Sequence, residues 1–431
     1  LDALELPPAL PVFDTMLAAY CLSPARLKVE AFAHGDWKGP LLWRAGKAYG
    51  EPEFRARLKA EGVLSLYEDV ERPLVSVLHS MEKLGVAVDA KYLSKLSMDF
   101  DEDIVELQKQ LDGLSGAAIN VNSPKQLAEL LYDKLGLPVL HKTAKGGRST
   151  DEECLKSLAG LHAIPAKVLE YRELSKLKGT YIDGLLDRLD PKTGRVHTRF
   201  EQTGTETGRL SSVNPNLQNI PIRSAAGRKI RRAFIAPKGW TLVSADYSQI
   251  DLRVLAHMSQ DPVLIDSFLK QEDIHTRTAS EVFKVPPEQV DKELRRRAKA
   301  VNFGSVYGQT PFGLSAELGI PQREAAAIIH NYFERYQGVA RWMDANLEEA
   351  RRTGVVRTFL GRVRQLPELA AKNTALRQFG ERAARNTPIQ GGSADVIKLA
   401  MLAVHEALRK GKFKSRLVLQ IPDELLFETP V

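Results

Sequence analysis

Two acidic positions that lie far apart in the sequence have the settings expected of metal ligands. Asp246 directly follows the apolar segment 240–245, and Asp423 with Glu424 lies between two apolar segments near the last residue. Taken singly, an aspartate at a strand end or a Pro-Asp pair is more often a turn residue. Together, these carboxylates could hold two divalent ions ~3.5–4 Å apart, which stabilise the attacking and leaving oxygens of a phosphoryl transfer. Magnesium fits because it prefers oxygen ligands.

Between these acids, a stretch with helical character carries cations and aromatic rings at strict four-residue spacing: Arg295, Lys299, Phe303 and Tyr307. Such positions share one face of a helix and span roughly 18 Å, enough for a triphosphate, a sugar and a base. An ordinary amphipathic helix would place its cations and its aromatic rings on opposite faces. The shared face therefore favours nucleotide binding. Gly304 and Gly308 weaken a helix, so we expect a ligand or another backbone to approach closely there.

A third group of polar residues lies in three short segments. Residues 207–212 and 216–221 are rich in Arg, Asn, Gln and Ser, and Asn386 and Gln390 precede a Gly-Gly pair. Alone, these segments are ordinary loops. Against DNA, Arg and Gln can donate to the minor-groove acceptors present in every base pair, which tests pair geometry without reading sequence.

The length and composition of the chain limit the classes of protein to which it can belong. A chain of 431 residues is too long for one typical core, so two to four domains are expected. The net charge of +7 permits a polyanionic partner without requiring one. Two cysteines, Cys21 and Cys154, give no disulfide framework and suit a reducing compartment. No apolar run is long enough to cross a membrane and no signal-peptide pattern is present, so we expect a soluble intracellular protein.

Periodicity and turn signals predict a multidomain α+β fold. Apolar residues at three- and four-residue intervals predict helices, one of them capped by Ser123 with Pro124 at its first position. The expected helices cover residues 64–85, 93–111, 125–135, 150–180 and most of 252–384. The expected β-structure comprises residues 195–245 and a hairpin of 416–421 with 425–428. The basic loop 141–150 is either a solvated linker or a tip that grips phosphates.

Long motifs in a fixed order resemble family A DNA polymerases, in particular the large (Klenow-type) fragments of the bacterial enzymes. These motifs are TGRLSS at 207–212, PNLQNIP at 215–221, DYSQI at 246–250, RRRAKAVNFGSVYG at 295–308 and QIPDE at 420–424. The resemblance implies a right-hand polymerase fold with an antiparallel palm sheet, helical fingers and thumb, and an N-terminal exonuclease-like remnant. The implied domains are the remnant at 1–62, palm at 63–89, thumb at 90–180, palm at 181–255, fingers at 256–385 and palm at 386–431.

Position by position, the resemblance also implies roles for individual residues. The implied metal site consists of Asp246, Asp423 and the Tyr247 carbonyl, with Glu424 as an auxiliary catalytic acid. The residues expected at the nucleotide are Arg295, Lys299 and His275 at the triphosphate, Phe303 at the sugar, Tyr307 at the templating site, and Gln249 and Asp251. The expected DNA contacts are Arg209, Gln218, Asn219, Arg223, Asn386, Gln390, Asn120, Asn122, Lys142 and Lys176.

The implied activity is template-directed DNA synthesis for replication or repair. A primer 3′-hydroxyl would attack the α-phosphate of a dNTP with the help of two Mg²⁺ ions, or Mn²⁺ as a substitute. The implied partners are a primer-template duplex and a dNTP, with no membrane, and the implied setting is a monomer in the bacterial cytoplasm at the nucleoid.

Three departures from the family pattern leave alternatives open. The family usually has glutamate where Asp251 stands, a side chain that excludes a ribose 2′-hydroxyl, and histidine where Pro422 stands. The segment that usually follows the hairpin is missing, so we expect a truncated chain. One alternative is therefore a primer-template-binding protein with impaired catalysis, and another is a polymerase with relaxed ribonucleotide exclusion. A nuclease is the weakest alternative, because residues 13–17 resemble one exonuclease motif without the others. We do not expect proofreading.

Overall fold

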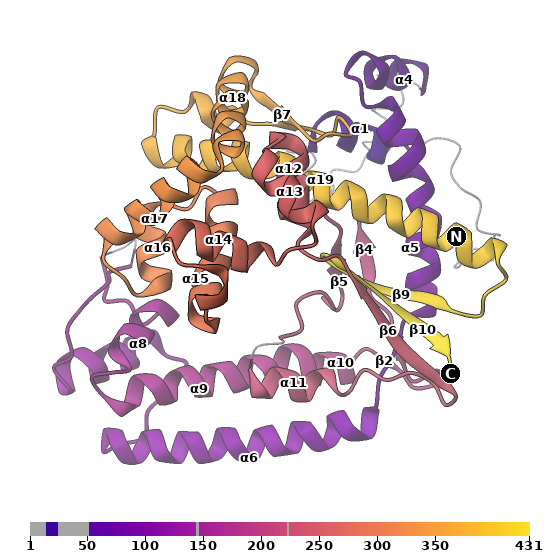
Figure 1. The fold of residues 1–431 in the computed structure, drawn as a ribbon. Coiled ribbons are helices and arrows are strands. Elements are labelled where there is room, and N and C mark those ends of the chain that lie inside the picture. The colour runs from indigo at the N-terminus through magenta and orange to yellow at the C-terminus, as the bar shows by residue number, and fades with distance from the viewer. Residues whose placement is uncertain (1–13, 25–50, 144–145, 222–223) are drawn as a thin grey trace. The chain divides into compact units, whose positions relative to one another are not determined.

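The computed structural model describes residues 14–24, 51–143, 146–221 and 224–431. These residues form two compact units that alternate along the chain (Figure 1). The first unit comprises the described residues up to Glu82 with Phe200–Ser212 and Val243–Thr429. The second comprises Lys83–Arg199, Val213–Leu242 and Pro430–Val431. Within the described residues, no helix has the length and hydrophobicity that crossing a membrane requires.

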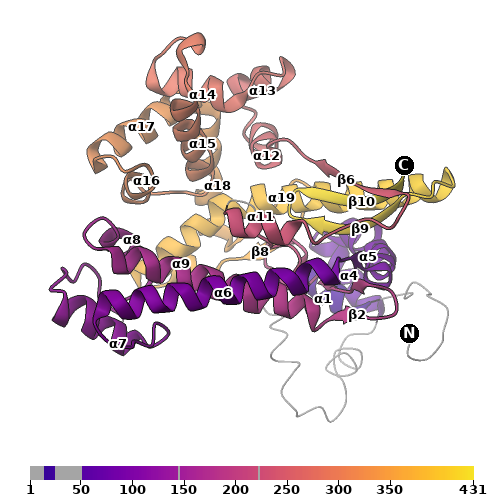
Figure 2. The same ribbon diagram turned by 90° about the horizontal axis from the view of Figure 1, so that it is seen from below.

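Helices dominate the second unit. They are α6 (Ala90–Ser115), α7 (Pro124–Ala128), η4 (Glu129–Lys134), α8 (Glu152–Leu158), α9 (Ala163–Leu177), η5 (Lys178–Asp183), α10 (Gly184–Leu186) and α11 (Ala225–Arg231). Helix α6 lies along α9 in both views (Figures 1 and 2). It begins where Asp89 accepts a hydrogen bond from the Tyr92 backbone N–H, and it ends at Gly116 in the left-handed conformation. The sequence-based expectation for this helix is therefore confirmed.

The other elements of the second unit follow simple local rules. The Ser123 side chain caps α7 and Pro124 takes its first position, as predicted. The buried side chains of Leu127, Leu155 and Val168 join α7, α8 and α9 in one core. A small antiparallel sheet of order β1-β3-β2 is made of β1 (Val86–Ala87), β3 (Arg195–Val196) and β2 (Leu189–Asp190).

The N-terminal part of the first unit is a helical cluster. It contains α1 (Thr15–Leu22), α4 (Glu51–Ala60), the π-helical turn η3 (Leu66–Glu71) and α5 (Arg72–Leu84). Asp14 caps α1 by accepting a hydrogen bond from the Leu17 backbone N–H. Leu17, Leu58 and Tyr67 are buried together in its core. The helix expected over 64–85 is confirmed as η3 running into α5, whereas Phe13 of the exonuclease-like motif lies outside the described residues.

The helical stretch expected over 252–384 is also confirmed. It contains α12 (Ile250–Ser259), α13 (Pro262–Leu269), α14 (Ile274–Phe283), η6 (Pro287–Gln289), α15 (Lys292–Val306), α16 (Pro311–Leu318), α17 (Gln322–Arg335) and α18 (Gln337–Thr353). A short hairpin that was not predicted, β7 (Val355–Arg357) with β8 (Val363–Gln365), and η7 (Pro367–Ala370) follow α18.

A three-stranded antiparallel sheet of order β6-β10-β9 carries the acidic residues. Its strands are β6 (Trp240–Asp246), β9 (Arg416–Ile421) and β10 (Glu424–Pro430). Glu424 pairs with Ile421, so Pro422 and Asp423 form the turn, which confirms the predicted hairpin. The prediction of β-structure over 195–245 is only partly right, because the other strands there are short: β3, β4 (Arg199–Glu201) and β5 (Ser211–Val213). Helix α11 and prolines, which lack a donor for a strand ladder, interrupt this segment.

Helix α19 (Thr374–Lys410) has 37 residues and continues through Pro388. Because proline has no N–H, the carbonyl of Ala384 one turn earlier loses its partner within the helix. The side chain of Asn346 on α18 fills this gap, and its Nδ2 donates to the Ala384 oxygen at 2.7 Å. A tertiary hydrogen bond thus replaces the missing helical one and joins α18 to α19.

Candidate active site

Two of the predicted acids lie at neighbouring strand ends. Strand β6 ends at Asp246, and the next residue, Tyr247, donates its backbone N–H to the carbonyl of Asp423 at 3.0 Å. Ser244 Oγ donates to Glu424 Oε1 at 2.6 Å, which fixes the third acid beside β6. The hairpin turn and the end of β6 therefore bring Asp246, Asp423 and Glu424 to one edge of the sheet.

The electrostatics of this edge favour a cation. Burial raises the pKa of Asp246, and the nearby charge of Glu424 raises it further. Burial also raises the pKa of Asp423, with Asp251 and Asp246 adding to the effect and Arg209 opposing it. These carboxyl groups are therefore close enough to repel one another, and a divalent ion would relieve that repulsion.

The donor set fits magnesium with an incomplete protein shell. Asp423 Oδ1 is buried and has no hydrogen-bond partner, so it is available as a ligand. In the part of the chain that the structure describes, no three Asp, Glu, His or Cys side chains are arranged as a finished cage. Mg²⁺ commonly binds one or two carboxylates and completes its shell with water and substrate phosphates, which agrees with this arrangement.

Asp251 forms the floor beside the acids. It is buried on α12 and accepts hydrogen bonds from the Tyr307 hydroxyl at 2.6 Å and from Ser393 Oγ at 2.5 Å. Arg209 Nη2 lies 3.6 Å from Asp251 Oδ2 and 3.9 Å from Asp423 Oδ1. The Arg209 guanidinium therefore lies between the buried Asp251 carboxylate and the Asp423 carboxylate at the acidic edge. Sequence reasoning missed Ser393, because no local signal connects two residues that meet only through the packing of α12 on α19.

The predicted cationic and aromatic face exists on α15 with one difference. The helix ends at Val306, so Tyr307 is its C-cap and Gly308 follows in the left-handed conformation with φ 67°. The Phe303 and Tyr307 rings are stacked with centroids 6.4 Å apart, and Lys299 Nζ lies 5.9 Å from the Phe303 ring centroid. These three side chains therefore follow one another in contact along α15 and end at the helix C-terminus.

The structure gives the two glycines local reasons of their own. A Cβ at Gly304 would overlap the side chain of Gln309, a residue of the same chain and not a ligand or another backbone. Gly308 is required by its positive φ after the helix end. Both glycines therefore shape the end of α15.

Two of the predicted triphosphate contacts have protein partners. Arg295 Nη2 forms an ion pair with Asp273 Oδ2 at 2.7 Å. His275 is buried, its Nδ1 lies 3.0 Å from Asn302 Nδ2, and burial lowers its pKa to about 4. At neutral pH the imidazole is therefore uncharged and can act only as a hydrogen-bonding group. Asn302 was missed because it meets His275 only through the packing of α14 on α15.

The remaining predicted residues of the first unit lie on α12 and α19. Gln249 takes a left-handed conformation with φ 49° at the start of α12, and its Oε1 accepts from Ser248 Oγ. Asn386 and Gln390 lie one turn apart on α19, on either side of Pro388. Asn386 Oδ1 is buried without a hydrogen-bond partner. Burial raises the pKa of the Tyr307 hydroxyl, and Gln390 lies close enough to that hydroxyl to oppose the rise, which places Gln390 beside the end of α15.

The other predicted DNA contacts belong to the second unit, where they are not part of the acidic site. Asn120 and Asn122 form a turn, in which Asn120 Oδ1 accepts from the Asn122 N–H at 3.0 Å. Lys142 pairs with Arg148 in an isolated β-bridge. Gln218 donates its backbone N–H to the Asn216 side chain. Arg223 lies outside the described residues.

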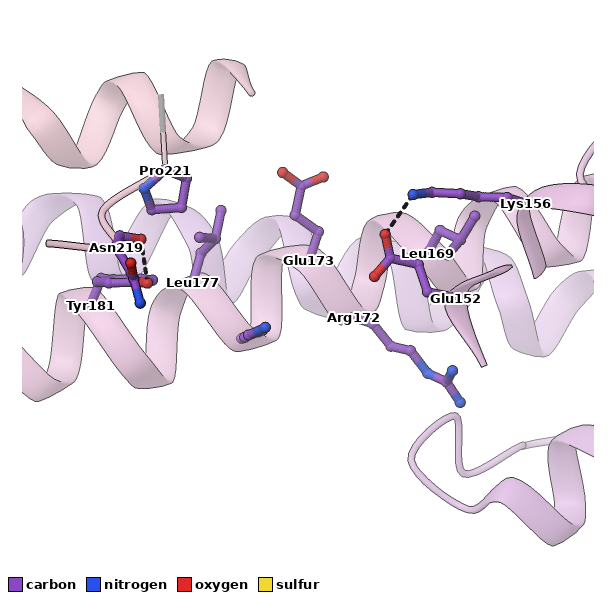
Figure 3. Close-up of a pocket in the computed structure, with 10 residues that line it drawn as sticks. Glu152, Lys156, Leu169, Arg172, Glu173, Leu177, Tyr181, Asn219 and Pro221 are labelled. Atoms are coloured by element: carbon purple, nitrogen blue, oxygen red, sulfur yellow. Dashed lines mark hydrogen bonds and ion pairs between the residues drawn. The ribbon is translucent and has the colours of Figure 1, made fainter. Parts of the chain in front are cut away.

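A pocket of about 690 Å³ in the second unit contains two more of these residues, Lys176 and Asn219 (Figure 3). The Tyr181 hydroxyl donates to the carbonyl oxygen of Asn219 at 2.5 Å and so joins η5 to the 214–221 loop. Arg172, on the same helix as Lys176, donates to the Thr150 carbonyl at 2.6 Å. Helix α9 therefore lines this pocket with both cations and the acidic Glu173, and a polar loop lies beside it.

Comparisons with known proteins agree with this geometry. The sequence model described as DNA polymerase family A matches residues 90–431. The chain is 48% identical over 437 residues to "DNA polymerase I, thermostable" of Thermus aquaticus, covering 100% of this chain and 52% of that protein. It is 44% identical over 448 residues to DNA polymerase I of Bacillus subtilis (strain 168), covering 97% of this chain and 51% of that protein. The chain thus spans about half the length of these curated relatives.

A solved structure shares the fold. The chain matches the "POL domain of Pol1 from M. smegmatis complex with DNA primer-template and dNTP" with a TM-score of 0.89 and 40% identity. The match covers 96% of this chain and 75% of that one. The helices and sheets described above are therefore those of a polymerase domain of the right-hand type.

Proposed function

This chain belongs to DNA polymerase family A, and on that premise we propose that it is a template-directed DNA polymerase. It adds a deoxynucleotide to the 3′ end of a primer, and pyrophosphate leaves. One observation carries the proposal. The hydrogen bond between the Tyr247 N–H and the Asp423 carbonyl sets two acids at neighbouring strand ends, and Asp423 Oδ1, which accepts no hydrogen bond, is available for a metal ion. Impaired catalysis is not favoured, because these acids are assembled despite Pro422.

Family A DNA polymerases depend on divalent metal ions, and the acidic edge supplies suitable ligands. Asp246, Asp423 and the Tyr247 carbonyl would hold two Mg²⁺ ions, or Mn²⁺ in their place, with Glu424 beside them. When bound, such ions favour the deprotonated primer 3′-hydroxyl and neutralise charge on the α-phosphate and the pyrophosphate. The chain itself holds the carboxylates at fixed positions at the strand ends, so that little reorganisation accompanies the reaction.

The face of α15 binds the incoming nucleotide in this proposal. Lys299 and Arg295 neutralise the phosphates, and Arg295 exchanges its Asp273 partner for a phosphate oxygen. His275 contributes a neutral hydrogen-bonding group. Phe303 meets the sugar and Tyr307 the templating position, while Gln249 and Asp251 complete the pocket. Closure of this helix over a correct pair would provide selectivity through induced fit.

The DNA contacts divide into two chemical kinds. Arg209, Asn386 and Gln390 donate to minor-groove acceptors near the primer terminus, where every base pair offers one. Residues of the second unit meet the phosphate backbone and set affinity without reading sequence. These residues are Asn120, Asn122, Lys142, Lys176, Gln218, Asn219 and Arg223.

The domain division and the cellular setting belong to the same proposal. Residues 63–89, 181–255 and 386–431 make up the palm, with the thumb at 90–180, the fingers at 256–385 and an inactive exonuclease-like remnant at 1–62. The protein acts as a monomer on a primer-template duplex. The solved neighbour's title describes a complex with DNA primer-template and dNTP for that protein. Its place is the bacterial cytoplasm at the nucleoid, in DNA replication and repair.

Single-nucleotide primer extension tests the proposal. With a matched primer-template and Mg²⁺, we expect the chain to add only the dNTP complementary to the template base, and a change of that base to change the nucleotide added. EDTA should abolish addition, and Mn²⁺ should restore it. Tight primer-template binding without addition of any dNTP would contradict the proposal and identify a binding protein instead.

Asp251→Glu tests the nucleotide pocket. Glutamate adds one methylene, and a methylene in a binding pocket changes discrimination by about tenfold or more. Hydrogen bonds from Ser393 and Tyr307 fix the short Asp251 side chain, so it extends less far into the pocket than a glutamate would. We therefore expect the wild-type chain to accept ribonucleotides more readily than the variant. The measurement is the ratio of kcat/KM for matched dNTP and rNTP. An identical ratio in both proteins would remove Asp251 from sugar selection.

A further inference from the structure

A short loop carries Arg209 to the acidic edge. Residues 204–209 lie in the loop between β4 and β5. The Arg209 Nη2 atom lies 3.6 Å from Asp251 Oδ2 and 3.9 Å from Asp423 Oδ1. Gly208 has φ 88°, and Thr205 Oγ1 donates to the Arg209 carbonyl at 2.7 Å. The position of the Arg209 side chain therefore depends on how the backbone of this loop is held.

The N-terminal helix α1 holds the loop from one side. The Tyr20 side chain is fully buried, and its hydroxyl donates to the carbonyl oxygen of Thr205 at 2.6 Å. The side chain of this same residue, Thr205, donates to the Arg209 backbone carbonyl. A chain of two hydrogen bonds thus leads from helix α1 to the backbone of Arg209.

Arginines of the β7–β8 hairpin hold the loop from the other side. Arg364 forms an ion pair with Glu206 and donates from Nη1 to Thr387 Oγ1 on α19 at 2.9 Å. Arg362 packs under Gly208, where a Cβ would lie 2.5 Å from the Arg362 Nε. The loop is therefore enclosed, and Tyr20 supplies the contact from the segment farthest away in sequence.

We propose that Tyr20 is a positioning residue for nucleotide addition, because its hydroxyl fixes the Thr205 carbonyl and so holds Arg209 beside Asp251 and Asp423. The inference rests on the proposed function. It gives the helix of the supposed exonuclease-like remnant a role in the polymerase reaction. Nothing in the role requires nuclease chemistry, since only the hydroxyl and its burial are used.

Tyr20→Phe removes the hydroxyl and keeps the ring. The matched control is Tyr67→Phe in the same helical cluster, since the Tyr67 hydroxyl accepts from the Asp14 N–H at 2.6 Å and lies outside the loop. Hydrogen–deuterium exchange of the free protein reports on the loop without any need for activity. We expect faster exchange in peptides covering residues 203–210 in Tyr20→Phe, and wild-type exchange there in Tyr67→Phe.

Single-turnover dNTP addition reports on the reaction. We expect Tyr20→Phe to lower the maximal rate about tenfold, the effect of one lost hydrogen bond, with the apparent Kd for dNTP nearly unchanged. On an Arg209→Ala background, Tyr20→Phe should change the rate less than about twofold, because the residue through which it acts is gone.

The outcomes separate the inference from the proposed function. Unchanged exchange in the loop, or rate effects of Tyr20→Phe and Arg209→Ala that simply multiply, would overturn the inference even if the wild-type chain is an active polymerase. Equal rate losses in Tyr20→Phe and Tyr67→Phe would also overturn it, as a general weakening of the core. Failure of wild-type chain to add any dNTP would instead overturn the proposed function and, with it, the role assigned to Tyr20.

Discussion

Asp246→Asn is expected to slow nucleotide addition by about 1000-fold while primer-template affinity stays within a few-fold. Asparagine has nearly the same shape but lacks the charge that a pair of divalent ions requires. Asp423→Asn should have the same effect, because Asp423 Oδ1 accepts no hydrogen bond and lies at the same acidic edge of the sheet. The double variant should lose little more than either single one, since two ligands of one metal pair act as a unit.

Single-turnover extension gives the rate, and fluorescence anisotropy of a labelled primer-template gives the affinity. Asp266→Asn is a suitable control, because it also removes one carboxylate from the first unit but only from a surface pair with Lys270. It should leave both quantities unchanged. Addition by Asp246→Asn at more than about a tenth of the wild-type rate would exclude Asp246 as an essential ligand.

Arg362→Met is expected to lower the free energy of unfolding by about 3–5 kcal/mol, because it leaves buried charges without their partner. Arg362 is 2% exposed and forms ion pairs with Glu71 and Asp395, which are both 0% exposed. Lys398, 1% exposed, forms a second ion pair with Glu71 at 2.6 Å. The cluster joins η3, the turn of the β7–β8 hairpin and α19, so its loss loosens the packing beneath the 204–209 loop.

The same cluster predicts a loss of stability in acid. Burial alone would raise the pKa of Glu71, but Lys398 and Arg362 together lower it from 4.5 to about 2. A lowered pKa means that the contribution of Glu71 is fully present above about pH 4.5 and disappears as the pH falls toward 2. The shift corresponds to about 3 kcal/mol. In Arg362→Met the acid transition should begin at higher pH, because Glu71 retains only one cation.

Denaturant unfolding at several pH values between 7 and 2.5 measures both effects. Arg352→Met removes an arginine from an exposed pair with Glu349 and should leave the unfolding midpoint unchanged. A midpoint for Arg362→Met equal to that of the control at neutral pH would show that the buried cluster adds no net stability.

The parts of the fold that could be predicted are those with strong local signals. The apolar period of α5, the Ser123-Pro124 cap and the apolar runs of β9 and β10 all act within a few residues of one another, so the sequence alone indicates them. The strand-end acids were predicted for the same reason, since each follows an apolar run that must become a strand.

The parts that could not be predicted depend on tertiary packing. Ser393 and Asp251 are 142 positions apart and meet only because α19 packs on α12. The charge of His275 could not be known, because its lowered pKa comes from burial against α15. The end of α15 before Tyr307 was missed, because the four-residue spacing continues past the point where Gly308 turns the chain.

The pairing of Pro388 with Asn346 has an evolutionary consequence. Proline at position 388 leaves the Ala384 carbonyl without its helical donor, and the Asn346 side chain donates to that carbonyl. Without the proline, the helix would supply its own donor and the asparagine would have no task. Without a donor at 346, a buried carbonyl would be left bare. We therefore expect selection to act on the two positions as one inherited unit, although they lie 42 positions apart (388 − 346).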